Sequence, residues 1–194
     1  MSTQRTLIRP QNLFIQMSGA PGSGKSTVAG LVASRINAVI IDHDVIRSSL
    51  IESGMEFNEA AKYAYPLQWA QARHFMKQGF SVIVDSACNY DEVLKQGAAC
   101  ASELSYTYWY IECKVDDIEL LQKRLCNRES MGSQRTGVDR PPAAAGTSRC
   151  PEDSLAQFKT WMEAPCRPEG NVIVVDSTLT PGACQASILE RVLG

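Results

Sequence analysis

Nine residues near the start of the chain, GAPGSGKST at positions 19–27, combine three glycines with a lysine and two adjacent hydroxyls. Gly19, Gly24, Lys25 and Ser26 match the Walker A spacing, and they stand between an apolar run and a helix-period pattern. Backbone N–H groups can surround a phosphate only where no Cβ intrudes, and a helix that begins near Lys25 would add the positive end of its dipole. This phosphate-binding motif predicts that the chain holds a nucleoside triphosphate.

Each position of the phosphate-binding motif has an expected role. The predicted nucleotide-binding residues are Ala20, Pro21, Gly22, Ser23, Gly24, Lys25, Ser26 and Thr27. Gly22 and Gly24 permit the backbone angles that such a turn needs, and Lys25 is expected to reach the β- and γ-phosphates. The hydroxyl of Ser26 is a predicted ligand of Mg²⁺. The alternative is a glycine-rich turn with an incidental lysine.

Further polar residues follow two other apolar runs. Asp42 ends one run, His43 and Asp44 follow it, and Arg47 comes one helical turn later, while Asp85 ends another run. Ligands of parallel α/β sheets bind at the carboxyl ends of the strands, so these residues are expected beside the phosphate-binding motif. There Asp85 can reach Mg²⁺ through water, although it could instead cap the next turn.

A segment rich in Gly, Pro, Ser and Arg covers about residues 129–151. Few of its apolar residues recur at the spacing of a helix or a strand, so a long loop is predicted. Loops above about 15 residues in a compact domain are usually functional or disordered. Arg124 and Arg128 precede it with i, i+4 spacing, so both are expected to face one way from a helix. Ordinary solvated surface arginines are the alternative, and Arg135 or Arg140 could share a functional role.

The remaining chain predicts alternating strands and helices. Strands are expected at residues 13–17, 38–42, 80–86, 106–113 and 171–177, with the second and fifth buried on both faces. Helices are expected at residues 25–36, 45–53, 59–78, 91–102, within 153–163, and from 181 to the end, together with one from an N-cap at Asp116 to Asn127. This alternation predicts an α/β fold with a parallel sheet and right-handed crossovers.

Composition narrows the function classes. The 194 residues, with 44% hydrophobic and 21% charged side chains, predict one globular domain over residues 1–194. A net charge of −2 gives no global field that would attract polyanions. Neither a membrane span nor a secretory signal is recognisable, so a cytoplasmic protein without a membrane partner is expected. The seven cysteines include no CxxC pair and are interpreted as reduced thiols, mostly core fillers.

The sequence resembles the P-loop kinases grouped with polynucleotide 5′-hydroxyl kinases, zeta toxins and chloramphenicol phosphotransferase. The resemblance covers about residues 13–177 and rests on four features. They are the phosphate-binding motif, DHDVIR (42–47), VIVDSACN (82–89), and the arginine pair before the 129–151 segment. It implies a three-layer P-loop NTPase fold, in which a five-stranded parallel sheet has helices on both faces and an arginine-bearing lid at about residues 129–151.

The same resemblance implies roles for particular residues. Asp44 matches the aspartate that accepts the proton of the attacking hydroxyl, and Arg47 matches an arginine that holds the acceptor. Arg124 and Arg128 would close over the triphosphate and, with Lys25, take part in catalysis. Two alternatives remain open: Asp44 could merely cap the following helix, and Asp42 is the rival base.

These features favour a kinase that uses ATP and Mg²⁺ to phosphorylate a hydroxyl of a small molecule. A polynucleotide 5′-hydroxyl kinase is the alternative, although a basic, aromatic-rich stretch for nucleic acid is lacking. A nucleotide-dependent binding module is a third hypothesis, but the NKxD signature of GTPase switches is absent. The candidate acceptor contacts are Tyr63, Tyr65, Trp69, Asn89 and Tyr90.

Overall fold

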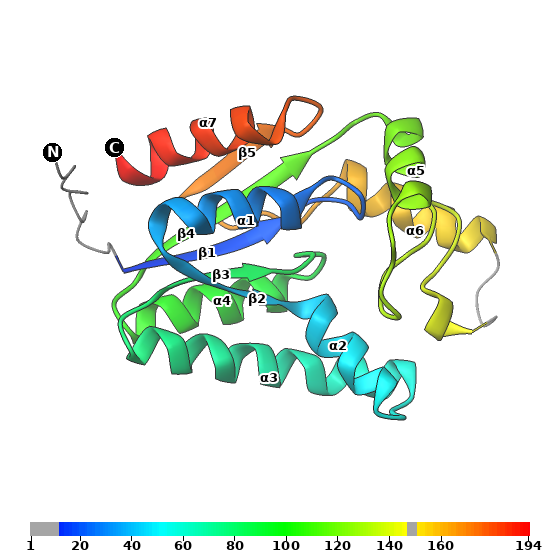
Figure 1. Cartoon of the computed structure of the whole chain (residues 1–194), viewed down its shortest axis with the longest axis horizontal. Coiled ribbons are helices and arrows are strands. Elements are labelled where there is room, and N and C mark those ends of the chain that lie inside the picture. The colour runs from blue at the N-terminus through cyan, green and yellow to red at the C-terminus, as the bar shows by residue number, and fades with distance from the viewer. Residues whose placement is uncertain (1–11, 147–150) are drawn as a thin grey trace, which may run out of the picture.

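A parallel β-sheet forms the centre of the molecule in the computed structural model, which describes residues 12–146 and 151–194 (Figure 1). Its strands within the described residues are β1 (Leu13–Ser18), β2 (Ala38–Asp42), β3 (Ser81–Asp85), β4 (Thr107–Lys114) and β5 (Val172–Asp176). They run in the order β2-β3-β1-β4-β5, and every neighbouring pair is parallel. The predicted five-stranded parallel sheet is therefore confirmed, with β1 at its centre.

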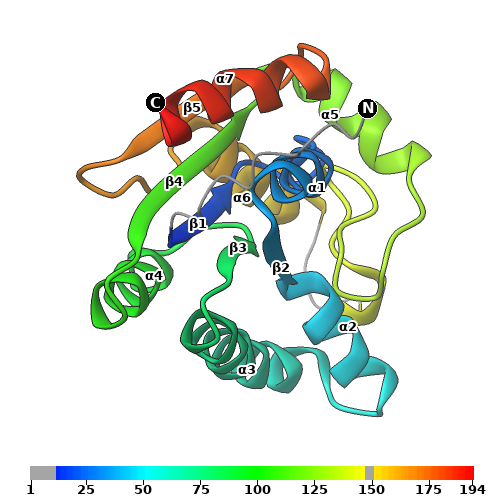
Figure 2. The same cartoon turned by 60° about the vertical axis from the view of Figure 1, so that its left-hand side comes forward.

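Helices cover both faces of the sheet. The helices α1 (Lys25–Ile36) and α7 (Pro181–Leu193) pack on one face, and α3 (Phe57–Lys77) and α4 (Asp91–Glu103) pack on the other. Figure 2 shows α3 and α4 side by side, on the opposite side of the sheet from α7. Of the helices in the described residues, none combines the length and apolar content needed to cross a bilayer.

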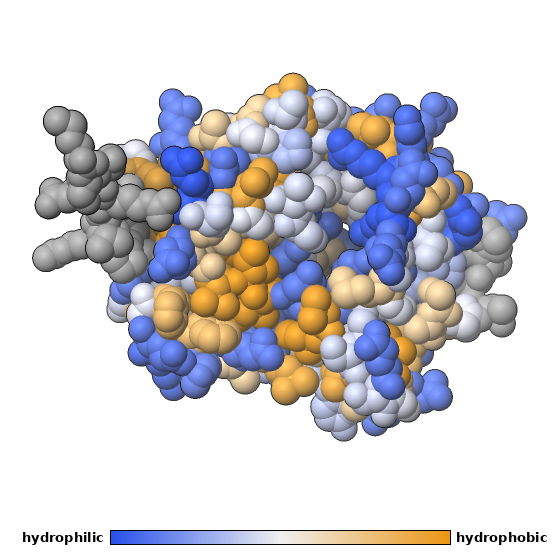
Figure 3. Space-filling view, in the orientation of Figure 1, coloured by the Kyte–Doolittle hydropathy of each residue, from blue (hydrophilic) through white to orange (hydrophobic). Residues whose placement is uncertain are grey.

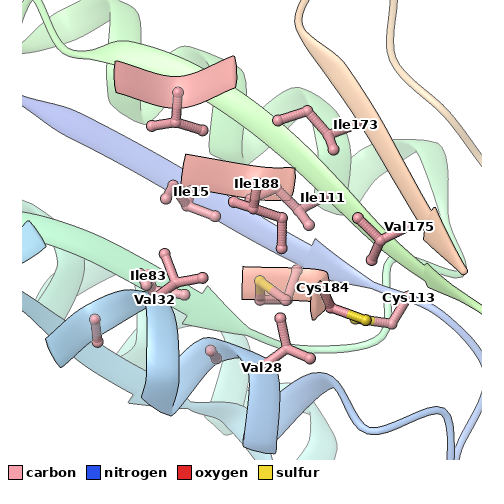
Figure 4. Close-up of a cluster of buried hydrophobic side chains, with 14 of the residues drawn as sticks. Ile15, Val28, Val32, Ile83, Ile111, Cys113, Ile173, Val175, Cys184 and Ile188 are labelled. Atoms are coloured by element: carbon pink, nitrogen blue, oxygen red, sulfur yellow. The ribbon is translucent and has the colours of Figure 1, made fainter. Parts of the chain in front are cut away.

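The side chains of β1 point alternately to the two faces of the sheet, where they contribute to two separate layers of the core. Leu13, Ile15 and Met17 join the cluster under α1 and α7, whereas Phe14 joins the cluster under α3 and α4. Figure 4 shows the first cluster, in which Ile15 lies close to side chains of α1 and α7. Because both faces of β1 are buried, the turn that leaves its carboxyl end is anchored in the middle of the molecule.

The two outer strands correct one prediction. β2 and β5 are edge strands, and Ile40 and Val174 keep 37% and 44% of their surface exposed, so neither strand is buried on both faces. Apolar side chains gather on the surface in the region of β2 and α3 (Figure 3). A continuous apolar run does not distinguish an edge strand from a central one.

Several helix boundaries also differ from the predictions. The second helix, α2 (His43–Glu52), begins two residues earlier than expected because Asp42 caps it. The helix α5 (Ile118–Asn127) is capped by Asp117, whose Oδ1 accepts hydrogen bonds from the Glu119 and Leu120 amides. Asp116, the expected cap, instead pairs with Lys114. The proline at position 66 lies inside α3 without ending it.

Beyond the carboxyl edge of the sheet lies a second group of elements, namely α5, residues 129–146 and α6 (Pro151–Glu163) (Figure 1). Residues 129–146, called here the 129–146 segment, contain a single short 3₁₀ helix (Ala143–Ala145), so the predicted loop is confirmed there. Residues 147–150 of that loop lie outside the described residues. A small core of Leu121, Leu125 and Phe158 joins α5 to α6, and Val138 packs against it.

Candidate active site

The phosphate-binding motif is the turn between β1 and α1. Gly19, Gly22 and Gly24 have positive φ angles of 129°, 86° and 94°. A Cβ at Gly19 would collide with the backbone oxygen of Cys113 on β4, so a larger residue cannot occupy that position without displacing the sheet. Nζ of Lys25 donates to the backbone oxygens of Gly19 (2.9 Å) and Ala20 (3.2 Å). The ammonium group is thus held at the loop that would receive the phosphates.

A cavity of about 1050 Å³ opens beside this turn and is called here the site cavity. It extends from α1 past the carboxyl ends of β2 and β3 to α2, α3, α6 and the 129–146 segment. Six of the eight predicted nucleotide-binding residues line it: Pro21, Gly22, Gly24, Lys25, Ser26 and Thr27. The side chains of Ala20 and Ser23 are buried behind the turn, so only their backbone could contribute to binding.

The carboxylates of Asp42, Asp44 and Asp85 line the site cavity. Asp42 and Asp85 are register partners at the ends of β2 and β3. Burial, together with the charges of Asp85 and Asp44, raises the pKa of Asp42 from its ordinary 3.8 to about 6. Burial also raises the pKa of Asp85, against the lowering effect of the Lys25 ammonium and of a hydrogen bond with Ser26.

This arrangement fits a magnesium ion. The mutual repulsion of Asp42 and Asp85 would be relieved by a cation, and Ser26 and Asp85 already touch. Mg²⁺ is typically held by one or two carboxylates together with substrate phosphates, and the phosphate-binding motif adjoins the two carboxylates. Ser26 and Asp85 are therefore suitably placed for the predicted metal role, and Asp42 is a further oxygen donor that the sequence did not assign to the metal.

Asp44 is not the cap of α2. The backbone amides of Asp44 and Val45 donate to Oδ1 of Asp42, at 2.8 and 3.3 Å, so Asp42 fills that role. The carboxylate of Asp44 lines the site cavity and accepts hydrogen bonds from Oγ of Ser133 (2.8 Å) and Nε2 of Gln134 (3.1 Å). No sequence pattern pointed to Ser133 or Gln134, because each is an ordinary polar residue in a loop about 90 positions away.

His43 packs beside the site. It is buried, its Nδ1 lies 3.0 Å from Oε1 of Gln68, and its ring lies 4.3 Å from that of Tyr65. Burial lowers the pKa of His43, which favours a neutral imidazole. The histidine therefore supports the position of Tyr65, which lines the site cavity.

Arg47 lines the half of the site cavity that α2 and α3 form. Its guanidinium lies 3.9 Å from the centre of the Phe57 ring, and Nη2 donates to the backbone oxygen of Phe57 at 3.2 Å. Burial lowers the pKa of Arg47, and among the described residues no carboxylate lies within ion-pairing distance of it. This cation is fixed in place but not neutralised.

Other walls of this half of the cavity come from α3 and from the turn after β3. Tyr65, Asn89 and Tyr90 line it, as the sequence suggested for acceptor contacts. Tyr63 points to solvent and Trp69 belongs to the core under α3, so neither reaches the cavity. Trp161 of α6 also lines it and was not among the candidates.

The arginine pair corrects a second prediction. Arg124 lies on α5, but Arg128 follows the end of that helix in extended backbone, so the two do not share a helix face. Arg124 donates to the backbone oxygens of Ser23 (3.4 Å) and Ser177 (2.9 Å), which links the phosphate-binding motif to the end of β5. Nη2 of Arg128 donates to the backbone oxygen of Arg135 at 3.1 Å.

The surroundings of Arg128 differ from those of Arg124. Burial lowers the pKa of Arg128, and the charge of Asp44 raises it. Its Nε is buried and has no hydrogen-bond partner within the part of the chain that the structure describes. Both arginines line the site cavity, Arg124 beside the phosphate-binding motif and Arg128 on the side of Asp44.

Arg135 and Arg140, to which the sequence left the same role open, lie in different surroundings, and of the two only Arg135 lines the site cavity. Arg135 is only 6% exposed, and its guanidinium donates to Val138 and to both the backbone and hydroxyl oxygens of Ser154. Arg140 is exposed, its Nη2 lies 3.0 Å from Sγ of Cys126, and it does not line the site cavity. Arg135 thus stabilises the 129–146 segment, whereas Arg140 lies on its outer surface.

The strand order, the helices on both faces and the phosphate-binding turn after β1 define a P-loop NTPase fold. The model of the AAA domain family matches residues 14–165, and the chain belongs to that family. The chain matches none of the curated proteins.

Solved structures with the same fold include several kinases. A candidate kinase of Chloroflexus aurantiacus is 16% identical with a TM-score of 0.69, over 95% of this chain and 97% of its own. A sugar kinase of Janibacter is 16% identical with a TM-score of 0.60, over 93% and 94%. The APS kinase of Mycobacterium tuberculosis, in complex with AMPPNP and APS, is 15% identical with a TM-score of 0.61, over 95% and 99%. Such identities establish a shared fold, and the narrower resemblance to polynucleotide kinases, zeta toxins and chloramphenicol phosphotransferase stays a prediction.

Proposed function

We propose that the chain is an ATP-dependent kinase that transfers the γ-phosphate to a hydroxyl group of a small molecule, with Asp44 as the general base. The observation that carries the proposal is the position of Asp44. Its carboxylate is free of the helix cap and opens into the same cavity as the phosphate-binding motif and Lys25. A module that only binds a nucleotide needs a carboxylate for the metal, such as Asp85, but it does not need the further carboxylate of Asp44 in the cavity.

In the proposed reaction, the acceptor oxygen attacks the γ-phosphorus in line with the oxygen that bridges to the β-phosphate. The bond to the bridging oxygen breaks, ADP leaves, and the proton of the acceptor hydroxyl passes to the Asp44 carboxylate. Phosphoryl transfer depends more on aiming the hydroxyl than on a strong base, so a carboxylate is sufficient. When bound by Ser26 and Asp85, Mg²⁺ would neutralise charge on the phosphates.

The acceptor would occupy the half of the site cavity that Arg47 and Tyr65 line. Arg47 would bind the acceptor, because its guanidinium is fixed over Phe57 and carries no ion pair among the described residues. Arg128 would stabilise the charge that develops during transfer, since it lies on the Asp44 side of the cavity. Arg124 would act beside the phosphate-binding motif, where it contacts Ser23.

The sugar kinase and the APS kinase that share the fold agree with a kinase reaction. A polynucleotide 5′-hydroxyl kinase, which would carry out the same phosphoryl transfer, is the second candidate function. Its acceptor end would need a cationic groove, whereas this cavity mixes charges of both signs: Lys25, Arg47, Arg124, Arg128 and Arg135 line it together with Asp42, Asp44, Asp85 and Glu129. The described site therefore favours a small acceptor over a polyanion.

A screen with labelled ATP tests the proposal. Sugars, sugar acids, nucleosides and 5′-hydroxyl oligonucleotides are offered with Mg²⁺, and labelled products are separated. We expect transfer to at least one small hydroxyl compound and none by a Lys25→Met variant. Transfer to oligonucleotides alone would favour the polynucleotide kinase. Tight ATP binding without transfer to any acceptor would contradict the kinase and favour a binding module.

A further inference from the structure

Two side chains of the 129–146 segment hold the carboxylate of Asp44, one on each oxygen. Oγ of Ser133 lies 2.8 Å from Oδ1, and Nε2 of Gln134 lies 3.1 Å from Oδ2. We propose that Ser133 and Gln134 are positioning residues that fix the Asp44 carboxylate for the incoming hydroxyl. This inference rests on the proposed function, because it gives that carboxylate the role of the base.

The side-chain amide of Gln134 is oriented by its own loop. Oε1 of Gln134 accepts a hydrogen bond from the backbone amide of Met131 at 3.3 Å, and the Gln134 amide donates to the Met131 backbone oxygen at 2.9 Å. The first contact places the carbonyl end of the side chain toward Met131. Its NH₂ end is therefore the one that faces Asp44, and the contact with Oδ2 is a true donor-to-carboxylate bond.

The hydroxyl of Ser133 is oriented by a chain of hydrogen bonds that begins on α2. The backbone amide of Ser133 donates to Oγ of Ser48 at 3.1 Å, and Oγ of Ser48 lies 3.0 Å from Oγ of Ser133. The Ser48 hydroxyl donates in that contact, so the Ser133 hydrogen is left for Asp44, whose Oδ1 lies at 2.8 Å and whose backbone oxygen lies farther away at 3.2 Å. Both serines are buried, so these hydrogen bonds are shielded from water.

These contacts suit a base better than an ion pair would. A serine hydroxyl and a carboxamide are neutral donors, so they restrain the Asp44 carboxylate without cancelling its charge. A carboxylate offers about four lone-pair sites, so one donor on each oxygen leaves room for the acceptor hydroxyl. Both donors belong to the 129–146 segment, so the position of the base depends on how that segment sits on α2.

A purely structural role for the same contacts is the competing explanation, because Ser133 and Ser48 also join the segment to α2. The two explanations differ in what happens when Asp44 is already inactive. A positioning residue acts through Asp44, so its removal should cost nothing further in an Asp44→Asn background. A residue that only stabilises the segment should cost the same in both backgrounds.

The test is a double-mutant cycle on single-turnover transfer from labelled ATP. Gln134→Met removes the donor at similar size, Gln134→Asn shortens its reach, and Ser133→Ala removes the hydroxyl. Each is made alone and together with Asp44→Asn, and Ser133→Thr, which keeps a hydroxyl, is the matched control. We expect a loss of about 10- to 100-fold in transfer rate for each single variant, a KM for ATP within about 2-fold, and no further loss beside Asp44→Asn.

Equal losses in both backgrounds, or an unchanged transfer rate in the Gln134 variants, would overturn the inference and leave the proposed function intact. Wild-type transfer by Asp44→Asn itself would overturn both, because the carboxylate would then have no role to be positioned for. Thermal unfolding and ATP binding of each variant show whether it is folded. Because Gln134 is only half-buried, its two variants keep the test decisive even if Ser133→Ala unfolds.

Discussion

Asp42 and Asp44, two positions apart at the start of α2, have different roles. Asp42 caps the helix and lies beside Asp85 at the ends of β2 and β3. The carboxylate of Asp44 makes no cap and lines the site cavity. The sequence predicted that both would lie near the phosphate-binding motif, but it could not separate them, because either position of DHD fits an N-cap. Backbone geometry at the end of β2 decides which one caps.

The pKa of Asp42 leads to a prediction about stability. Its value of about 6 in the folded protein exceeds the ordinary 3.8, so the folded state keeps a proton that the unfolded state has released between about pH 4 and 6. This carboxyl therefore lowers the free energy of unfolding as pH rises through that range, and the loss is complete above about pH 6. Asp42→Asn keeps a capping side chain and should be more stable than the wild type at pH 7 but not at pH 4.

Urea unfolding without Mg²⁺ or nucleotide at several pH values between 4 and 8 measures this difference. The stability advantage of Asp42→Asn should grow between about pH 4 and 6 and stay constant above that range. A constant difference across the range would show that the carboxyl of Asp42 is not desolvated as described.

Arg128 allows a second prediction at the same scale. If its guanidinium stabilises charge that develops only during transfer, Arg128→Ala should lower kcat by about 10- to 1000-fold while the KM for ATP changes far less. Steady-state kinetics with a saturating acceptor measures both constants. A rise in KM at constant kcat would instead assign Arg128 to ATP binding in the ground state.

At the scale of elements, the sequence predicted the features that depend on a local residue pattern, namely the strands, most helices and the long loop. Hydrophobic periodicity indicated the strands and most helices, and the composition of residues 129–151 indicated a loop. It could not show that β2 and β5 are edges, that Arg135 is buried against α6, or that the loop reaches Asp44. Each of these depends on contacts between segments far apart in the chain, which have no local signature.

The 129–146 segment contains a matched pair of arginines for a test of its packing. The guanidinium of Arg135 lies 5.5 Å from the centre of the Phe158 ring and 5.7 Å from that of Trp161, and it donates to the buried Ser154. Arg135→Ala would leave those oxygens unsatisfied and should lower the free energy of unfolding by about 2 to 4 kcal/mol. Arg140→Ala, on the exposed surface of the same segment, should change it by less than about 0.5 kcal/mol. Equal effects in denaturant unfolding would contradict this assignment.

At the scale of the whole molecule, α5, the 129–146 segment and α6 lie beyond the carboxyl edge of the sheet (Figure 1). Residues of this outer group and of the elements next to the sheet line the site cavity together. The parallel sheet and the position of the phosphate-binding motif could be predicted, because strands alternate with helices and the motif follows a strand. The strand order could not, since a crossover can return to either side of a strand. The walls of the acceptor half come from four separate elements, so its shape was not readable from any one stretch.

Nucleotide binding should stabilise the entire chain. A ligand that binds only the folded state at 100 times its Kd adds about 2.7 kcal/mol, which is about 5 to 11 °C in Tm for a chain of this size. ATP with Mg²⁺ should raise the Tm by that order, and Lys25→Met should lose most of the shift. An equal shift in both proteins would mean that the nucleotide binds elsewhere.

The most direct test of the central claim compares wild type and Asp44→Asn in two measurements made together, ATP affinity and acceptor-dependent transfer. We expect ATP affinity within about 3-fold of the wild type and a transfer rate lower by about 100-fold or more, because the cap of α2 and the phosphate-binding motif are untouched while the proton acceptor is lost. Transfer at the wild-type rate would contradict the role of Asp44 as the base.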